Sequence, residues 1–295
     1  MNKKNRSVIF AGLLLSGNAC IPNASALEIT PGDYEPLPAQ TTMLLLYYQH
    51  AERTDFYLSG KKLSDNYRLN SDIGMLRVIH AIGLNDNISI SPQVILPFGR
   101  MAASGEAQAL GKTSGIGDLV LGAPVKIRLN TASNDILAFG PYLYLPTGSH
   151  DRNDALNMGE NRWRFLLQGA WIHRVSDKWA LDTAADVSWV TDNNEYGPNA
   201  QTQKQKPRYE YQAYMRYQLT PQLALGFGGG YIDGARSSID GADQNDALRT
   251  TYARLTATYF ITPTLQVQAQ VGRDLHVSQG FEEDRRFNLR LATLF

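Results

Sequence analysis

The sequence has little cysteine and no long apolar segment beyond its first residues. Its one cysteine is Cys20 among 295 residues, which excludes disulfide, thiolate-metal and thiol-nucleophile chemistry from the rest of the chain. No later segment approaches the ~20 consecutive apolar residues of a membrane helix. The 28 basic and 28 acidic side chains cancel, so bulk charge does not indicate a nucleic-acid partner. No linker-like stretch divides the chain after its first forty residues, which predicts one folded domain.

The first 26 residues have the pattern of a secretory signal peptide. Lys3, Lys4 and Arg6 form a basic start, residues 8–15 are apolar, and Ala24-Ser25-Ala26 is a small-residue cleavage site. The mature chain is therefore expected to begin at Leu27. Cys20 leaves a lipoprotein signal as the alternative.

From residue 41 onward, apolar and polar residues alternate in segments of about ten residues. This period of two, over the length that a tilted strand needs to cross a bilayer, predicts a transmembrane antiparallel up-and-down β-barrel of about twelve strands. The segment 287–295 is the clearest, because its odd positions are Phe, Leu, Leu, Thr and Phe. The predicted strands are 41–52, 70–83, 87–98, 115–129, 135–146, 162–174, 178–190, 208–219, 222–232, 249–260, 264–274 and 285–295.

Short turns and long polar loops alternate between these strands, a pattern that favours an outer-membrane barrel over a soluble sandwich. With the short turns on the periplasmic side, this alternation over an even number of strands places both termini on that side as well. The expected organisation is a signal peptide (1–26), an N-terminal periplasmic segment or plug (27–40) and an outer-membrane β-barrel (41–295). Residues 27–40 hold three prolines and cannot join a sheet ladder, so they form either a plug below the lumen or a disordered tail.

Three short stretches resemble a known family. They are Gly115-Ile116-Gly117-Asp118-Leu119, Leu145-Pro146-Thr147-Gly148 and Asn157-Met158-Gly159-Glu160-Asn161-Arg162-Trp163. They are similar to the outer-membrane transporters named after the meta-pathway of phenol degradation. The resemblance implies uptake of small, often aromatic or hydrophobic molecules. The alternative is that these glycines only build turns at a barrel rim.

The C-terminal residue carries a second resemblance. A strand that ends on an aromatic, here Phe295, is similar to the signal by which the barrel-insertion machinery recognises outer-membrane proteins. The other expected partners are outer-membrane lipid and a small-molecule cargo.

Orienting the apolar positions outward turns a set of charged and aromatic side chains toward the lumen, with basic groups in excess. They form either a hydrated, partly basic path or ion pairs that seal the interior. Twelve strands leave a narrow conduit, since eight fill with side chains and sixteen leave an open channel. The ninth strand has few inward side chains, because Ala224, Gly226, Gly228 and Gly230 face inward, and the space left is either open or filled by bulky partners such as Tyr142, Tyr144 and Tyr214. The candidate lumen or ligand residues are Arg77, Asp118, Arg128, Tyr142, Tyr144, Arg164, Asp182, Asp186, Glu210, Tyr214, Arg216, Arg254 and Arg290.

Two rival functions remain at this point. His276 and Ser278 lie two residues apart, as in outer-membrane lipid hydrolases, but no orienting partner is evident, so we expect no enzyme activity. A structural barrel is the other alternative. The remaining histidines lack metal-ligand spacing, so neither a metal nor another cofactor is expected.

Prolines concentrate in the third to fifth predicted strands. Pro92, Pro97, Pro124 and Pro141 each lack the N–H that a barrel ladder needs. They either sit at bulges or weaken the wall enough to open a side gap, through which an apolar cargo could enter the bilayer.

Overall fold

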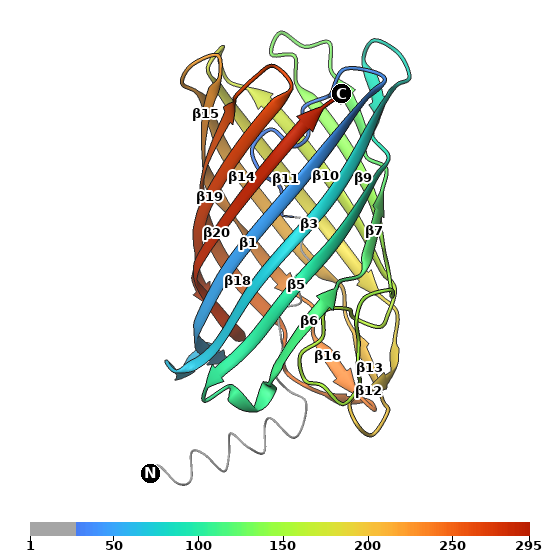
Figure 1. Ribbon diagram of the computed structural model, residues 1–295, viewed down its shortest axis with the longest axis vertical. Helices are drawn as coiled ribbons and strands as arrows, with labels where there is room; N and C mark the ends of the chain where they lie inside the picture. Colours follow the sequence, from blue (N-terminus) through green and yellow to red (C-terminus); the bar gives the residue numbers. More distant parts are fainter. Residues whose placement is uncertain (1–27) are drawn as a thin grey trace.

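The computed structural model describes residues 28–295. The predicted signal peptide and Leu27 lie outside this part. Within it, no helix is both long and apolar enough to span a membrane. The chain forms a closed antiparallel barrel of twelve strands, which confirms the predicted fold class (Figure 1). The last strand pairs with the first, from Met43 opposite Leu294 to Tyr57 opposite Gly280.

Two of the first four barrel strands, the third and the fourth, are broken into shorter segments. The first two are β1 (Thr41–Leu58) and β3 (Tyr67–Gly83), with β2 (Lys61–Ser64) in the hairpin between them. The third consists of β4 (Ile88–Ile90) and β5 (Gln93–Gly105). After the 3-10 turn η1 (Gln108–Leu110), the fourth consists of β6 (Lys112–Ile116), β7 (Leu119–Gly122) and β8 (Val125–Arg128).

The other eight barrel strands are continuous: β9 (Ile136–Leu145), β10 (Arg164–Arg174), β11 (Trp179–Val190), β14 (Arg208–Gln218), β15 (Leu223–Gly234), β18 (Leu248–Phe260), β19 (Leu265–Val277) and β20 (Gly280–Leu294). Two long loops also pair with each other. They form a small sheet of β12 (Asn193–Tyr196), β13 (Gln201–Gln205), β16 (Ser237–Ile239) and β17 (Ala242–Asp243), at the end of the barrel opposite the C-terminus (Figure 1).

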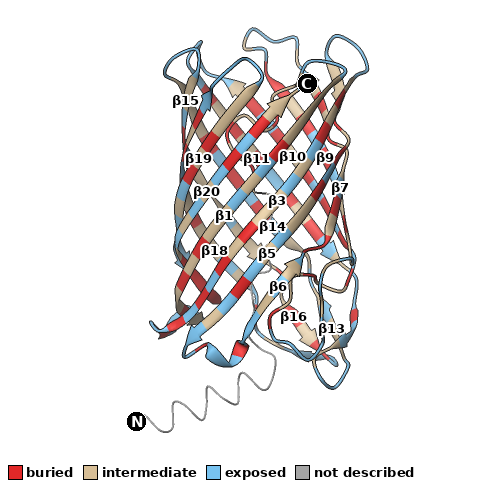
Figure 2. Cartoon of the chain, viewed as in Figure 1, coloured by how far each residue is buried: buried red, intermediate tan, exposed pale blue. Residues whose placement is uncertain are grey.

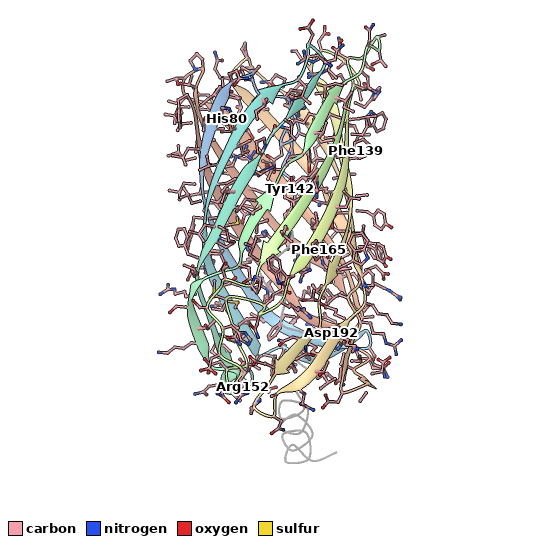
Figure 3. All side chains as sticks on the ribbon, turned by 90° about the vertical axis from the view of Figure 1, so that its right-hand side faces the viewer. His80, Phe139, Tyr142, Arg152, Phe165 and Asp192 are labelled. Carbon is pink, nitrogen blue, oxygen red and sulfur yellow. The ribbon has the colours of Figure 1, made fainter. Side chains whose placement is uncertain are left out.

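Burial alternates along each strand, because successive side chains point to opposite faces (Figure 2). In β10, Phe165 and Leu167 are exposed whereas Leu166 and Gln168 are buried. Phe139 and Phe165 point away from the barrel while Tyr142 points into it (Figure 3). The outer surface is therefore an apolar belt, as a lipid-facing wall requires.

Several strands extend beyond their predicted ends at the long-loop end of the barrel. The first strand continues to Leu58, the third to Gly105, and the last begins at Gly280. There the inward side chains Phe56, Tyr67 and Phe281 form an apolar cluster with loop residues. The outward-facing residues of these extensions lie beyond the apolar belt. The alternation of apolar and polar residues therefore ends there, although the hydrogen bonds between the strands continue.

Candidate functional site

The N-terminal segment, residues 28–38, lies inside the barrel near the end that holds the C-terminus (Figure 1). Ile29 and Tyr34 are buried against inward-facing side chains of β9, β10, β11 and β14. The Ile29 amide donates to Gln212 Oε1 at 2.9 Å, and the Tyr34 hydroxyl donates to Gln168 Oε1 at 2.5 Å. The segment therefore fills the lumen without joining the sheet, consistent with its prolines.

Three carboxylates of the N-terminal segment pair with arginines of the wall. Glu28 accepts from Arg254 Nε at 3.0 Å. Asp33 accepts from Arg290 Nη1 at 2.6 Å. Glu35 accepts from Arg216 Nη2 at 2.6 Å. The basic excess expected from the strands is thus offset by acids that the barrel strands do not contain.

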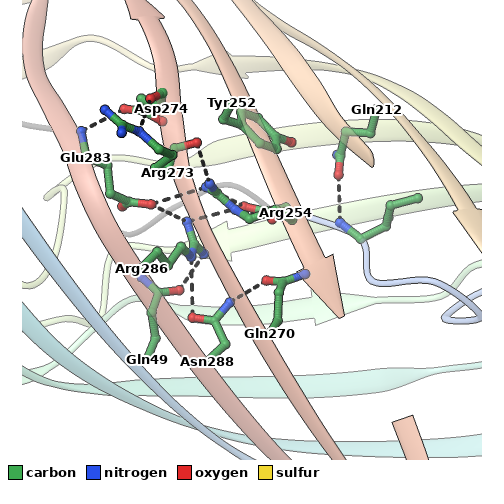
Figure 4. A network of polar contacts seen from close by, with 12 residues as sticks. Gln49, Gln212, Tyr252, Arg254, Gln270, Arg273, Asp274, Glu283, Arg286 and Asn288 are labelled. Carbon is green, nitrogen blue, oxygen red and sulfur yellow. Dashed lines mark hydrogen bonds and ion pairs between the residues drawn. The ribbon is translucent and has the colours of Figure 1, made fainter. Parts of the chain in front are cut away.

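Arg254 lies at the centre of a polar network in the lumen. It also donates to Glu283 Oε1 at 3.2 Å, and its guanidinium lies 4.4 Å from the ring centre of Tyr252. Arg286, on β20, lies 3.2 Å from Glu28 and 3.6 Å from Glu283 (Figure 4). Two arginines therefore share two carboxylates, with every side chain in the group largely buried.

The glycines of β15 provide the space that the N-terminal segment occupies. A Cβ at Gly226 would lie 2.6 Å from Pro31 of the segment. At Gly228 and Gly230 the space is taken instead by Tyr214 and Tyr252. Sequence reasoning identified this strand's lack of inward side chains and named Tyr214 as a possible occupant, but it did not identify Pro31 or Tyr252.

The other predicted lumen residues are mostly buried and bonded to one another. Asp182 accepts from Arg216 and from the Gly32 amide, and Glu210 accepts from Tyr252 and Arg208. Asp186 accepts from Gln168, at 3.1 Å. Further contacts join Tyr142 to Tyr34, Tyr214 to Glu28, Arg77 to Gln93 and Tyr47, and Tyr144 to Arg164. Arg128 differs from the expectation, since it lies exposed at the end of β8 and not among these pairs.

The three stretches that carry the family resemblance meet at one place near the long-loop end. Asp118 accepts from the amides of Gly148 at 2.9 Å and Glu160 at 2.8 Å. A Cβ on Gly148 would lie 2.7 Å from the Gly159 backbone, so both positions require glycine. This contact fastens the 146–163 loop to the barrel wall and supports the turn-building interpretation of the motif glycines.

Glu160 completes this loop anchor. It accepts from Arg162 Nε at 3.1 Å and from Arg164 Nη2 at 2.6 Å. Burial raises the pKa of the Glu160 carboxyl, but Arg164 and Arg162 outweigh it and lower the pKa to about 2. The loop therefore stays fastened at neutral pH. Glu160 lies within a motif stretch, but no sequence pattern distinguished it from its neighbours.

The four prolines lie in a wall that is hydrogen-bonded across each of them. The carbonyl oxygens accept hydrogen bonds of 2.8 to 3.2 Å from backbone amides of the neighbouring segment: Pro92 from His80, Pro97 from Gly117, Pro124 from Ser91 and Pro141 from Ala123. In an antiparallel ladder such a pair normally exchanges two bonds. Each proline residue and its cross-strand partner therefore share one hydrogen bond, where a regular pair shares two. The interruption between β4 and β5 includes Pro92, and the interruption between β7 and β8 includes Pro124.

A small cavity in the lumen lies against this wall. A cavity of about 20 Å³, room for about one water molecule, is lined by Ser91, Gln93, Pro124 and Lys126 of the wall and by Asp33 and Tyr34 of the segment. The Ser91 hydroxyl and the Gln93 amide nitrogen face no partner among the described residues.

His276 and Ser278 do form the pair expected from the sequence, with 3.2 Å between Nε2 and Oγ. His276 is exposed, near the end of β19. Within residues 28–295, no carboxylate bonds to its other ring nitrogen, so the pair lacks the third member of a catalytic triad.

Comparisons with known proteins agree with this architecture. Residues 52–291 match the family described as "Putative MetA-pathway of phenol degradation". The COG4313 outer membrane channel from Pseudomonas putida F1 is 44% identical, with a TM-score of 0.89 over 91% of this chain and 100% of that chain. The translocator domain of the autotransporter NalP from Neisseria meningitidis shares only the fold, at 8% identity and a TM-score of 0.51 over 99% of this chain and 96% of that one.

No match was found among curated protein sequences. The chain nevertheless has the fold of an outer-membrane channel, and the 44% identical protein from Pseudomonas putida F1 is described as one. The match over most of its length and the shared barrel together show that this chain belongs to the MetA-pathway family of phenol degradation.

Proposed function

We propose that this protein takes up small aromatic or hydrophobic molecules across the bacterial outer membrane, and that residues 28–38 plug its lumen. The plug carries this proposal, because its three carboxylates occupy the arginines that a passing molecule would otherwise meet. The family description supports an aromatic cargo. The aromatic cluster of Phe56, Tyr67 and Phe281 at the loop end, with ring centres 4.8 to 5.3 Å apart, offers such a cargo an apolar entrance.

The partly basic lumen belongs, in this proposal, to the open state. With the plug in place, Arg216, Arg254 and Arg290 are paired. When the plug moves, these three arginines lose their carboxylate partners from the segment. The conduit would then favour anions such as aromatic carboxylates.

We further propose that both termini face the periplasm and that β12, β13, β16 and β17 face the medium. Phe295 lies at the end of β20 with its amide bonded to Thr42, where it would serve as the insertion signal. A protease site inserted at the exposed turn 197–200 is expected to be cut on intact cells. The same site at the turn of Ser176 and Asp177 is expected to be protected until the outer membrane is permeabilised. The opposite pattern would reverse the orientation.

A side exit through the proline wall is the second candidate route. Two observations favour it. The four proline pairs that share only one hydrogen bond all lie between β3 and β9, and the small lumen cavity borders Pro124. A hydrophobic molecule leaving there would pass into the bilayer without returning to water.

Restoring the missing donors tests this exit. Replacing both Pro124 and Pro141 with Val supplies two ladder N–H groups and should slow uptake of an apolar compound several-fold, while ion conductance stays unchanged. Uptake is measured in proteoliposomes, with Pro221→Val in a short turn as the matched control. Equal uptake by the double variant and the parent would eliminate the lateral route.

A further inference from the structure

On the outer face of one half of the barrel, four of six neighbouring strands carry an arginine at the long-loop edge of the apolar belt, whereas β1 and β3 carry His50, Glu52 and Asp72 there. On β5, β18, β19 and β20, the first charged residue that follows the outward-facing apolar positions is Arg100, Arg249, Arg273 and Arg285, respectively. On β20, for example, Leu291, Leu289 and Phe287 precede it, and all three are exposed. We call these four residues the arginine row.

The guanidinium groups of the arginine row are more accessible than their acidic partners. The side chains of Arg100, Arg249 and Arg273 are 73%, 65% and 58% exposed. Their partners Asp72, Asp233 and Glu282 are only 24%, 43% and 11% exposed. Each carboxylate lies 3.0 to 3.7 Å from one guanidinium nitrogen, so more than half of each of these arginine side chains stays accessible on the outer face.

The carboxylate beside Arg100 is held in place by its neighbours. Asp72 accepts from Arg100 Nε at 3.0 Å, from the Tyr48 hydroxyl at 2.8 Å, and lies 2.7 Å from His50 Nδ1. These groups come from β1, β3 and β5 and face outward. A charged cluster on a lipid-facing wall is costly within the hydrocarbon, so it marks the upper boundary of the apolar belt.

An apolar groove runs from this boundary down the lipid-facing wall. Its volume is about 630 Å³, and Leu46, Tyr48, Phe98, Leu289 and Leu291 are among its lining residues. Its polar end is formed by Asp72, Arg100 and Ser114. An acyl chain attached to an anionic headgroup has this distribution of apolar and charged surface.

The opposite end of the same strands has a different composition. The turns at residues 84–87 and 261–264 consist of Leu, Asn, Asp, Ile, Thr and Pro. Cationic side chains therefore border the apolar belt at one end of this wall. That asymmetry fits a membrane with phosphorylated glycolipid in one leaflet.

We propose that the arginine row binds the phosphate groups of lipid A, with one acyl chain in the groove below Arg100. The proposal rests on the proposed orientation, in which the long-loop end lies in the outer leaflet. Guanidinium forks bind phosphate oxygens in pairs, and each basic side chain near an anionic lipid surface strengthens binding. The site lies outside the barrel and does not depend on what passes through the lumen.

Lipid binding by the purified full-length mature protein in detergent tests this. The probe is lipid A carrying both phosphates, and bound lipid is counted by native mass spectrometry. The triple variant Arg100→Ala, Arg273→Ala, Arg285→Ala should bind about tenfold more weakly or worse. The matched control, Arg152→Ala, Lys204→Ala, Lys206→Ala, removes three charges from exposed loop positions and should bind as the parent does. Retention of the heat-resistant folded form verifies that both variants fold.

Two further probes identify the headgroup. Dephosphorylated lipid A and phosphatidylglycerol should each bind the parent much more weakly than lipid A. Equal binding of dephosphorylated lipid A, equal binding of phosphatidylglycerol, or an equal loss in the loop control would each overturn the proposal. A failed uptake assay would refute the transport function but leave this result unaffected, and the protease-site experiment tests the orientation by itself.

Discussion

Deletion of residues 28–38 should raise the single-channel conductance several-fold and give the channel a preference for anions. The deletion removes the side chains that fill the lumen and leaves Arg216, Arg254 and Arg290 without the segment's carboxylates. It retains the predicted cleavage site and every residue of the barrel strands. Conductance and reversal potential in planar bilayers, under a salt gradient, measure both effects.

A point variant separates loss of the plug from damage to the barrel. Gly226→Val places a side chain where Pro31 lies, since even a Cβ there would approach it to 2.6 Å. It should displace the segment and raise conductance in the same direction as the deletion. Gly169→Val, in β10 where a Cβ would have one neighbour, the Ala185 carbonyl oxygen at 4.0 Å, is the spatial control. Unchanged conductance in both the deletion and Gly226→Val would show that residues 28–38 do not block the path.

Arg254→Met is expected to lower the stability of the barrel by about 3–5 kcal/mol, the typical cost of removing one partner from a buried ion pair. The side chains of Arg254, Glu28 and Glu283 are 2%, 8% and 7% exposed, so the two carboxylates would remain buried with less compensation. Urea unfolding in lipid vesicles and the temperature at which the folded band disappears on gels measure the loss.

Two companion variants identify its cause. Arg128→Met removes an equal charge from an exposed strand end and should leave stability nearly unchanged. Adding Glu28→Gln to Arg254→Met should recover part of the loss, because the carboxylate that loses Arg254 Nε becomes neutral while Glu283 stays paired with Arg53 and Arg286. Changed ion selectivity at full stability would instead indicate that Arg254 lines a hydrated path and does not act as a seal.

Most of the barrel could be predicted because its physics is local. A strand in a lipid-facing wall must alternate, and a tilted strand must be about ten residues long, so the twelve predicted ranges lie close to the observed strands. The strand ends at the loop side could not be predicted. Outside the apolar belt, solvent removes the alternation while the backbone ladder continues to Leu58 and Gly105.

Only part of the candidate site could be predicted from the sequence. Parity identified Arg254, Arg290 and their neighbours as lumen residues, because inward positions follow directly from the strand period. Their partners did not follow from it. Glu28 is 226 residues from Arg254, and Asp33 is 257 residues from Arg290. No local pattern specifies which of several arginines an irregular segment will reach.

By itself, the sequence determined the barrel, its strand number and which side chains face inward, since all three follow from the two-residue period and the length of each apolar segment. Only the tertiary structure decided how the inward charges pair, where residues 28–38 lie and how the three motif stretches meet around Asp118. Closing the sheet brings distant strands around a common interior, and the volume and charge left there select the contacts that fill it.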